Sequence, residues 1–303
     1  MFGIAMLELD GRRTAALVQG EEVLDLSRAL PRESAGSGLL GNDTLELLRN
    51  WPAALPALER LAAAPRRGDY RVPRAQARWL PPVCYPDKLL CAGANYTDHA
   101  KEMGSRPQDA ATDHPFFFLK SARNTLIGDG EAIVLPPASQ KVDWEVEVAV
   151  VIGRRAKHVP AAAAMDYVAG YTVFNDISAR DLNRRTDVPF PHDWVGGKCA
   201  DTFGPLGPAI VPSQFVSDWR RLHLRLRVNG ALKQDAPAAL MIHSIPAQIA
   251  FLSRTITLEP GDIIATGTPA GVGAGRQEFL KPGDVVVSEI EGIGRLTNRC
   301  VAE

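Results

Sequence analysis

Short strand-like runs dominate the chain after residue 88, and they constrain the fold more than any other feature. Runs of β-branched and aromatic residues, each bounded by glycine or proline, predict strands. Few helices are expected there: one after Asn95, one over 161–166 and one over 244–253. Strands and helices therefore do not alternate regularly, which favours an α+β, mainly β fold over a doubly wound α/β sheet. The predicted strands are 89–92, 116–120, 132–135, 142–152, 170–174, 222–228, 262–266 and 285–290.

The first 80 residues have a different organisation. Three short strands are expected at 3–9, 14–19 and 21–26, followed by helices over 44–48 and 57–64. Several prolines then indicate an extended linker. The sequence therefore predicts a small N-terminal α/β domain over residues 1–80 and a larger, mainly β domain over residues 81–303.

Charge and cysteine content exclude several classes of function. Lys and Arg number 34 and Asp and Glu 35, which gives a net charge of −1, whereas a protein that binds nucleic acid or anionic lipid through its net charge should be clearly basic. The four cysteines form no CxxC pair, which argues against a disulfide framework or a thiolate zinc site. No export signal is evident, and no apolar run approaches the roughly 18–20 residues of a membrane span. We therefore expect a cytoplasmic protein that acts on a small molecule.

The segment 142–152 contains the most informative pattern. It alternates with period two, so that Glu145 and Glu147 share one face with Asp143. The two glutamates would stand roughly 6–7 Å apart, close enough to bind one ion together. The alternative is that these acids line the solvent-exposed face of an edge strand and bind no ion. A third acid, Asp176, follows the apolar strand 171–174, and a site made of oxygen ligands alone suits Mg²⁺, Mn²⁺ or Ca²⁺ better than zinc.

A possible general base precedes the acidic strand. His99 and Glu102 follow the strand 89–92 and a glycine turn, and on a helix they are i, i+3 neighbours. A carboxylate beside an imidazole fixes its tautomer and supports its action as a base. An ordinary pair on a helix surface is the alternative interpretation.

Two lysines and a glycine-rich loop complete the set of candidates. Lys120 ends an aromatic run, and Lys198 follows two glycines in a predicted loop. The loop 266–275 lacks both the P-loop lysine and the full GxGxxG pattern, so it predicts neither phosphate binding of that type nor NAD binding. We expect it to offer backbone N–H groups and the Thr268 hydroxyl to an anionic substrate.

Together these segments resemble the fumarylacetoacetate hydrolase family. Matching motifs occur in family order across roughly residues 84–300. The resemblance rests on Gly93-x-Asn95-Tyr96-x-x-His99-x-x-Glu102, Phe118-Leu119-Lys120, Asp143-Trp144-Glu145-x-Glu147, Asn175-Asp176-x-Ser178-Ala179-Arg180-Asp181, Gly197-Lys198-x-x-Asp201 and Thr266-Gly267-Thr268-Pro269.

This resemblance implies a fold, a cofactor and a substrate class. It implies a catalytic domain of mixed β-strands rolled into a sandwich-like barrel, usually within a homodimer. It also implies Mg²⁺ or Mn²⁺ held by Glu145, Glu147 and Asp176, and substrates that are β-diketo acids or 2-oxo acids. We expect hydrolysis of a C–C bond in an acylpyruvate-like 2,4-diketo acid, such as a fumarylpyruvate-type intermediate of aromatic catabolism.

The expected roles follow from this chemistry, because C–C cleavage between carbonyl fragments leaves an enolate that a cation can stabilise. His99, oriented by Glu102, would deprotonate water, and Lys198 would neutralise charge. Candidates for substrate binding are Lys120, Arg180, Asn183 and Thr268.

Two departures from the family pattern bear on the substrate. Asn183 stands where glutamine is frequent, and Cys199 replaces a common serine. The stretch 184–194 resembles a lid that shapes specificity.

Other functions remain as alternatives. An isomerase or a decarboxylase of a 2-oxo-ene-dioate would use the same site and substrate class. A non-catalytic ligand-binding protein would be expected to have lost a carboxylate ligand or His99, and all of these are present.

Overall fold

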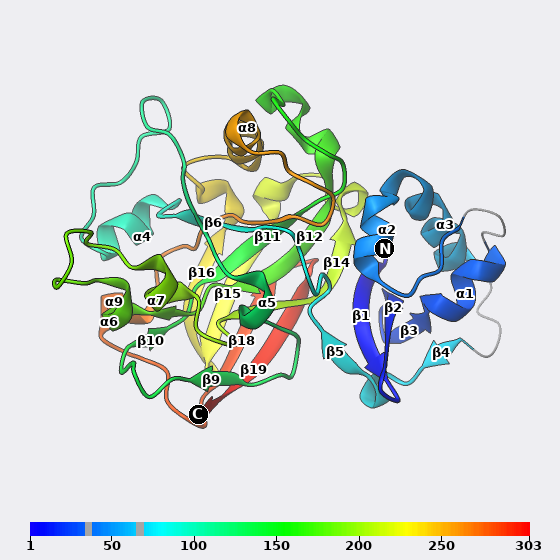
Figure 1. The fold of residues 1–303 in the computed structure, drawn as a ribbon, viewed down its shortest axis with the longest axis horizontal. Coiled ribbons are helices and arrows are strands. Elements are labelled where there is room, and N and C mark those ends of the chain that lie inside the picture. Colours follow the sequence, from blue (N-terminus) through cyan, green and yellow to red (C-terminus); the bar gives the residue numbers. More distant parts are fainter. Residues whose placement is uncertain (34–37, 65–69) are drawn as a thin grey trace.

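The computed structural model describes residues 1–33, 38–64 and 70–303, and the statements below refer to these residues. The described strands form sheets of twelve, five and two strands, which confirms the prediction of a mainly β fold (Figure 1). The twelve-stranded sheet runs in the order β4-β3-β2-β1-β14-β12-β11-β17-β6-β7, with β5 beside β1 and β8 beside β14. Its strands are β1 (Gly3–Leu9), β2 (Arg12–Gln19), β3 (Glu22–Asp25), β4 (Arg71–Val72), β5 (Arg78–Leu80), β6 (Leu89–Gly93), β7 (Phe116–Leu119), β8 (Leu126–Ile127), β11 (Val146–Ile152), β12 (Val168–Asn175), β14 (Gly204–Pro212) and β17 (Ile263–Ala265).

The five-stranded sheet packs against part of the large sheet. The main hydrophobic core contains Val148 and Tyr171 from the large sheet together with Leu224 and Val286 from the five-stranded sheet. Burial of these apolar side chains between two sheets is the main source of stability for such a layered fold. The five strands are β16 (Ala231–Pro237), β15 (His223–Val228), β18 (Val285–Ile290), β19 (Gly294–Ala302) and β9 (Ile133–Leu135); the pair is β10 (Val142–Asp143) and β13 (Ser178–Ala179).

Helices are short in the larger part of the chain. Helix α8 begins after Ser244, whose side chain accepts a hydrogen bond from the amide of Ala247, as the N-terminal cap of a helix does. In the same way Asp43 caps α2. The helices are α1 (Leu26–Glu33), α2 (Thr44–Arg49), α3 (Trp51–Ala63), α4 (Thr97–Glu102), α5 (Ala122–Thr125), α6 (Arg180–Asn183), α7 (Trp194–Lys198), α8 (Ile245–Thr255) and α9 (Gly273–Arg276), with 3-10 turns at Arg74–Gln76, Ala161–Tyr167, Ser213–Phe215, Trp219–Arg221 and Ala238–Leu240.

The N-terminal strands and helices lie to one side of β14 (Figure 1). Strand β1 pairs with β14, with Ile4 opposite Ile210, so the large sheet continues from one part of the chain into the other. The rings of Phe2 and Phe215 also meet edge to face, with centroids 5.1 Å apart. The predicted boundary at residue 80 coincides with the end of β5, and the division into two domains stays a prediction.

Several elements differ from the sequence prediction. The expected strand 142–152 is two strands, because the chain leaves the sheet at Trp144 and Glu145, where the Glu145 amide donates to Oδ1 of Asn175 at 2.9 Å. The expected helix over 161–166 is a 3-10 helix. Strand β14 was not expected because it holds three prolines, which cannot donate to a strand ladder. The elements α1, β16 and β19 were also not predicted.

Candidate active site

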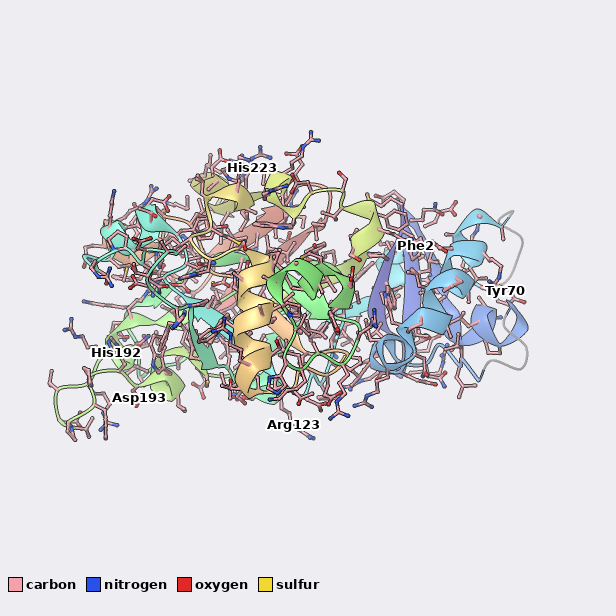
Figure 2. All side chains as sticks on the ribbon, turned by 90° about the horizontal axis from the view of Figure 1, so that it is seen from above. Phe2, Tyr70, Arg123, His192, Asp193 and His223 are labelled. Atoms are coloured by element: carbon pink, nitrogen blue, oxygen red, sulfur yellow. The ribbon has the colours of Figure 1, made fainter. Side chains whose placement is uncertain are left out.

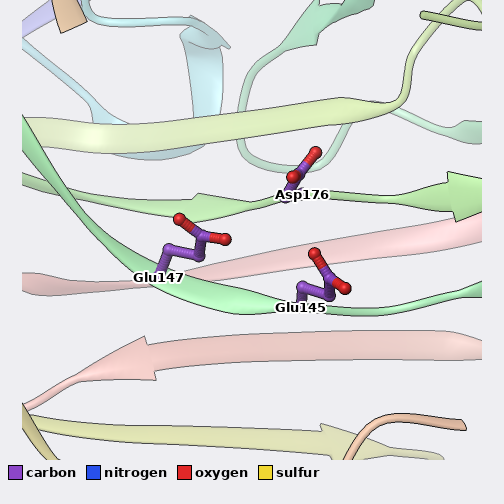
Figure 3. A group of neighbouring side chains, drawn as sticks. All are labelled: Glu145, Glu147 and Asp176. Carbon is purple, nitrogen blue, oxygen red and sulfur yellow. The ribbon is translucent and has the colours of Figure 1, made fainter. Parts of the chain in front are cut away.

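Three carboxylates meet where strand β11 begins and strand β12 ends (Figure 3). Antiparallel pairing sets Val146 opposite Asn175, which brings Glu145 and Glu147 beside Asp176. The Asp176 amide donates to the Glu145 carbonyl at 2.8 Å and holds the two segments together. One oxygen from each carboxylate lies within 4.8 Å of the others. Glu145 and Glu147, from the alternating row, therefore meet Asp176, from the end of β12, at one point.

These acids are buried, which excludes the interpretation that they line the solvent-exposed face of an edge strand. Strand β11 lies between β12 and β17, inside the large sheet. The residues Glu145, Glu147 and Asp176 are 5%, 1% and 1% exposed. Buried carboxylates are costly to ionise unless cations or hydrogen-bond donors surround them.

Two lysines and an arginine supply part of this compensation. Lys198 donates from Nζ to Glu145 and to Asp176, at 2.7 Å in both cases. Lys120 binds Asp176 at 2.5 Å and the carbonyl of Ile177 at 2.9 Å. Arg180 contacts Glu145 at 2.5 Å and Asp143 at 2.8 Å. Burial raises the pKa of Glu145, but the positive charges of Lys198 and Arg180 outweigh it and hold this pKa far below its usual value.

Glu147 is the least compensated member of the group. Burial, together with the negative charges of Asp176 and Glu145, raises the pKa of Glu147 well above its usual value. The Gly267 amide, which donates to Oε2 at 2.7 Å, only partly offsets this effect. A divalent cation among the three oxygens would remove the remaining penalty, and a set of carboxylate oxygens is what Mg²⁺ and Mn²⁺ prefer. The residues present therefore fit such an ion.

The imidazole and its partner carboxylate lie on α4. Nδ1 of His99 is 3.5 Å from Oε2 of Glu102, as expected for i, i+3 neighbours, but this separation is too long for a good hydrogen bond. Nδ1 is buried and has no hydrogen-bond partner in the described structure. Glu102 accepts the Gly271 amide at 3.0 and 3.1 Å, and although burial opposes it, His99 and this amide lower the pKa of Glu102.

A cavity of about 300 Å³ connects these groups. Its lining includes seven of the predicted residues, whereas Glu102, Lys120 and Asp176 are not part of it. A larger hollow of about 810 Å³ near Phe279 and the C-terminus contains none of the predicted site residues. The seven are His99, Glu145, Glu147, Arg180, Asn183, Lys198 and Thr268.

The loop 266–275 supports the acids, which differs from its predicted role. Its amides bind protein carboxylates: Gly267 binds Glu147, Gly271 binds Glu102, and Gly273 binds Asp143 at 2.6 Å. These N–H groups are therefore not free for a substrate. The hydroxyl of Thr268 donates to the Val146 carbonyl and accepts from Gln234, at 2.9 and 2.8 Å.

Lys198 also differs from its expected setting. It ends the short helix α7 and does not lie in a loop. Asp193 caps this helix by accepting the Gly196 amide at 2.8 Å. The close approach of Asn183 to Gly197 leaves no room for a side chain there, since an added Cβ would lie 2.4 Å from that of Asn183. This glycine therefore allows α6 and α7 to pack together beside the acids.

Comparison with known proteins decides the family. The fumarylacetoacetate hydrolase C-terminal profile matches residues 88–301. The chain belongs to the fumarylacetoacetate hydrolase family. The mitochondrial oxaloacetate tautomerase Fahd2a of Rattus norvegicus is 44% identical over 232 residues, which cover 76% of this chain and 71% of that protein.

Solved structures of this family share the fold over the whole chain. A putative HpcE protein from Mycobacterium smegmatis has a TM-score of 0.82 and 35% identity, covering 98% of this chain and 99% of that one. Maleylpyruvate hydrolase from Sphingobium sp. SYK-6, in complex with a manganese(II) ion and pyruvate, has a TM-score of 0.77 and 30% identity, covering 100% and 99%. The family thus contains enzymes with different reactions on small molecules.

Several residues around the candidate site of this chain were not among the predicted site residues. Asp143 accepts Arg180 and the amides of Gly273 and Ala274, so it anchors the surroundings of Glu145. Its place in the alternating row was the available signal. The cavity is also lined by Arg184 and His192, and the lid-like stretch 184–194 was the available signal for both. Within the described part of the chain, no helix combines the length and apolar character that a membrane crossing requires.

Proposed function

We propose that this protein is a divalent-metal-dependent enzyme that forms the enol or enolate of a small 2-oxo acid. The observation that carries the proposal is the buried group of Glu145, Glu147 and Asp176 in a cavity that His99 also lines. An ion held by these three carboxylates would supply Lewis-acid stabilisation of the negative charge that develops on the substrate oxygens. Mg²⁺ and Mn²⁺ both suit this ligand set.

The side chains around the ligands keep the site ready for this chemistry. Lys198 holds Glu145 and Asp176 in place and keeps positive charge at the cavity wall. Arg180 fixes Glu145 from the other side. Such fixed charges need no reorganisation when negative charge develops, which makes them effective in catalysis.

Keto–enol tautomerisation is the reaction that we propose first. It needs only one proton to move between C3 and the oxygen on C2, and His99 is the cavity residue suited to carry that proton. Oε2 of Glu102 is 3.5 Å from Nδ1. A closer approach of this carboxylate during the reaction would stabilise a proton on Nδ1 and leave Nε2 as the proton acceptor. The 44% identity to an oxaloacetate tautomerase supports this reaction and a substrate such as oxaloacetate.

Hydrolysis of an acylpyruvate-like 2,4-diketo acid is the second candidate, and the His99–Glu102 pair favours it. His99 would take a proton from water, and the hydroxide would attack C4. The C3–C4 bond then breaks, its electron pair stays with the pyruvate fragment, and a proton is added at C3. The 30% identity to maleylpyruvate hydrolase supports this candidate. Isomerisation or decarboxylation of a 2-oxo-ene-dioate would pass through the same enolate.

One set of assays separates these reactions. Oxaloacetate is followed by the loss of enol absorbance, and fumarylpyruvate by the release of pyruvate, each with Mg²⁺, Mn²⁺ or EDTA. We expect activity that EDTA abolishes and either metal restores. The proposal would be contradicted if EDTA left the activity on every substrate unchanged. The cytoplasmic location and the homodimer both stay predictions. Light scattering of the purified protein tests the homodimer.

A further inference from the structure

The lining of the cavity changes in character from its floor to its rim. The floor residues Glu145, Glu147 and Lys198 are buried, whereas Arg184 and His192 are exposed at the rim. A 2-oxo acid bound at the carboxylate group would place its 1-carboxylate and 2-oxo group at the floor. The remaining end of the substrate would therefore face the rim.

The cations at the floor already have partners. Lys198 binds two carboxylates, and Arg180 binds Glu145 and Asp143. Both acids among the described lining residues, Glu145 and Glu147, also lie at the floor. The floor therefore offers no uncommitted positive charge to a second anionic group of a substrate.

Arg184 is different. Within the described ranges its guanidinium forms no ion pair, although the next residue, Arg185, is paired with Asp187 and Asp193. Arg184 is nevertheless held in place by its backbone, which forms an isolated bridge with His192. The amide of Asp193 donates to the carbonyl of Asn183 at 2.8 Å and closes the same loop. Figure 2 shows His192 and Asp193 where this loop joins the body of the protein.

A second polar group beside Arg184 also lacks a partner. Asn183 lines the cavity, and its buried Oδ1 has no hydrogen-bond partner in the described structure. A buried polar atom without a partner costs free energy, and its amide can turn either its oxygen or its nitrogen toward a ligand. Two successive residues of the cavity lining, Asn183 and Arg184, thus have polar groups without a protein partner among the described residues.

We propose that Arg184 is a specificity-determining residue that binds a second, distal carboxylate of the substrate, so that the substrate is a dicarboxylate. The proposal rests on the proposed function for the position of the chelating end. The planar guanidinium suits bidentate binding of a carboxylate. Asn183 would add a hydrogen bond from its amide nitrogen to the same carboxylate.

Binding of two unreactive analogues tests this proposal without turnover. Malate and lactate share the carboxylate and hydroxyl that can chelate a metal, and malate adds a distal carboxylate. Titration calorimetry on the Mn²⁺-loaded full-length protein gives the ratio of their dissociation constants. We expect malate to bind at least roughly tenfold more tightly, the size of one charge-assisted contact. Arg184→Gln should reduce this preference to near unity and leave lactate binding unchanged.

The neighbouring arginine provides a matched control. Arg185→Gln removes the same charge from the same loop, and Arg185 is not among the cavity-lining residues. We expect it to keep the wild-type preference for malate, and Arg184→Lys to keep part of it. A wild-type protein without preference for malate, or an Arg184→Gln variant that retains the preference, would overturn the proposal. Equal losses in both glutamine variants would also overturn it, because they would indicate a general charge effect.

Turnover then separates this proposal from the proposed function. With oxaloacetate, Arg184→Gln should raise KM roughly tenfold while changing kcat much less, since the residue binds the end of the substrate that does not react. If no 2-oxo acid is turned over but malate is still selected through Arg184, the proposed function fails and the dicarboxylate site stands.

Discussion

The buried ammonium of Lys198 donates a hydrogen bond to the buried carboxylate of Glu145, with Nζ 2.7 Å from Oε2. The same ammonium reaches Asp176, so one cation holds two of the three acids that would bind the metal. Burial lowers the pKa of Lys198, but the charges of Asp176 and Glu145 outweigh it and raise this pKa above the usual value. Lys198 is therefore charged at neutral pH.

Replacing Lys198 by methionine should destabilise the metal-free protein strongly. Removing one partner of a buried ion pair leaves uncompensated charge and typically costs about 3–5 kcal/mol. Urea unfolding of the metal-free variant measures this loss, and Mn²⁺ should restore part of it. Lys233→Met is the control, because Lys233 pairs with a half-exposed Glu278 at the surface and should change stability by about 1 kcal/mol or less. Equal effects of the two substitutions would contradict the compensating role of Lys198.

Removal of the metal should make stability depend on pH through Glu147. The pKa of this carboxyl is raised in the folded metal-free protein, so the folded state binds the proton more tightly than the unfolded state. Its contribution is fully present below the unfolded pKa of about 4.3 and is lost as the pH rises from there through the raised folded pKa. Glu147→Gln should remove this loss, and EDTA-treated variant protein should be at least as stable as EDTA-treated wild type at pH 8. The same variant should lose metal binding, measured by Mn²⁺ titration.

His99 is expected to matter for catalysis and not for metal binding. If it transfers the proton, His99→Ala should lower kcat by about 10²–10⁴ and leave the Mn²⁺ affinity within a few-fold of wild type. His223→Ala is a suitable control, because His223 lies on β15 beside Asp235, away from the cavity lining. Rapid tautomerisation or hydrolysis by the His99 variant would refute its assignment as the base.

Asp25 should give the N-terminal part its own dependence on pH. Burial raises the pKa of this carboxyl, but hydrogen bonds from Thr14, Ser27 and Arg12 outweigh it and lower the pKa. Its stabilisation is therefore present above the unfolded pKa of about 3.9 and is lost as the pH falls through the lower folded value. Asp25→Asn should cost about 1–3 kcal/mol at pH 7 in urea unfolding. The same change at exposed Asp166 should have little effect at any pH.

The acidic row and the helical pair were predictable because local patterns define them. Alternation along a strand places Glu145 and Glu147 on one face, and three positions along a helix bring His99 next to Glu102. The interruption of the strand at Trp144 was not predictable, because it depends on contacts with distant segments. One of these is the hydrogen bond that the Trp144 indole donates to the Gly271 carbonyl.

The partners of the cationic residues could not be predicted for the same reason. Arg180 was expected to bind substrate, yet the structure shows its guanidinium bound to Asp143 and Glu145. Whether a cationic side chain finds an acidic partner depends on which distant segments pack against it. The described structure pairs Arg180 with two carboxylates and shows no ion pair for Arg184, a difference that the sequence does not reveal. The expected binding roles of Lys120, Arg180, Asn183 and Thr268 stay predictions.

The turn that follows β17 connects the His99–Glu102 pair with the buried carboxylates. The amides of Gly267, Gly271 and Gly273 in this turn hold Glu147, Glu102 and Asp143 respectively. At Gly271, with φ of +108°, an added Cβ would lie 2.0 Å from the Lys233 carbonyl, so this backbone path accepts no larger residue without a shift. A single change in the backbone path of this turn would therefore displace the partner carboxylate of His99 and one member of the acidic group at the same time.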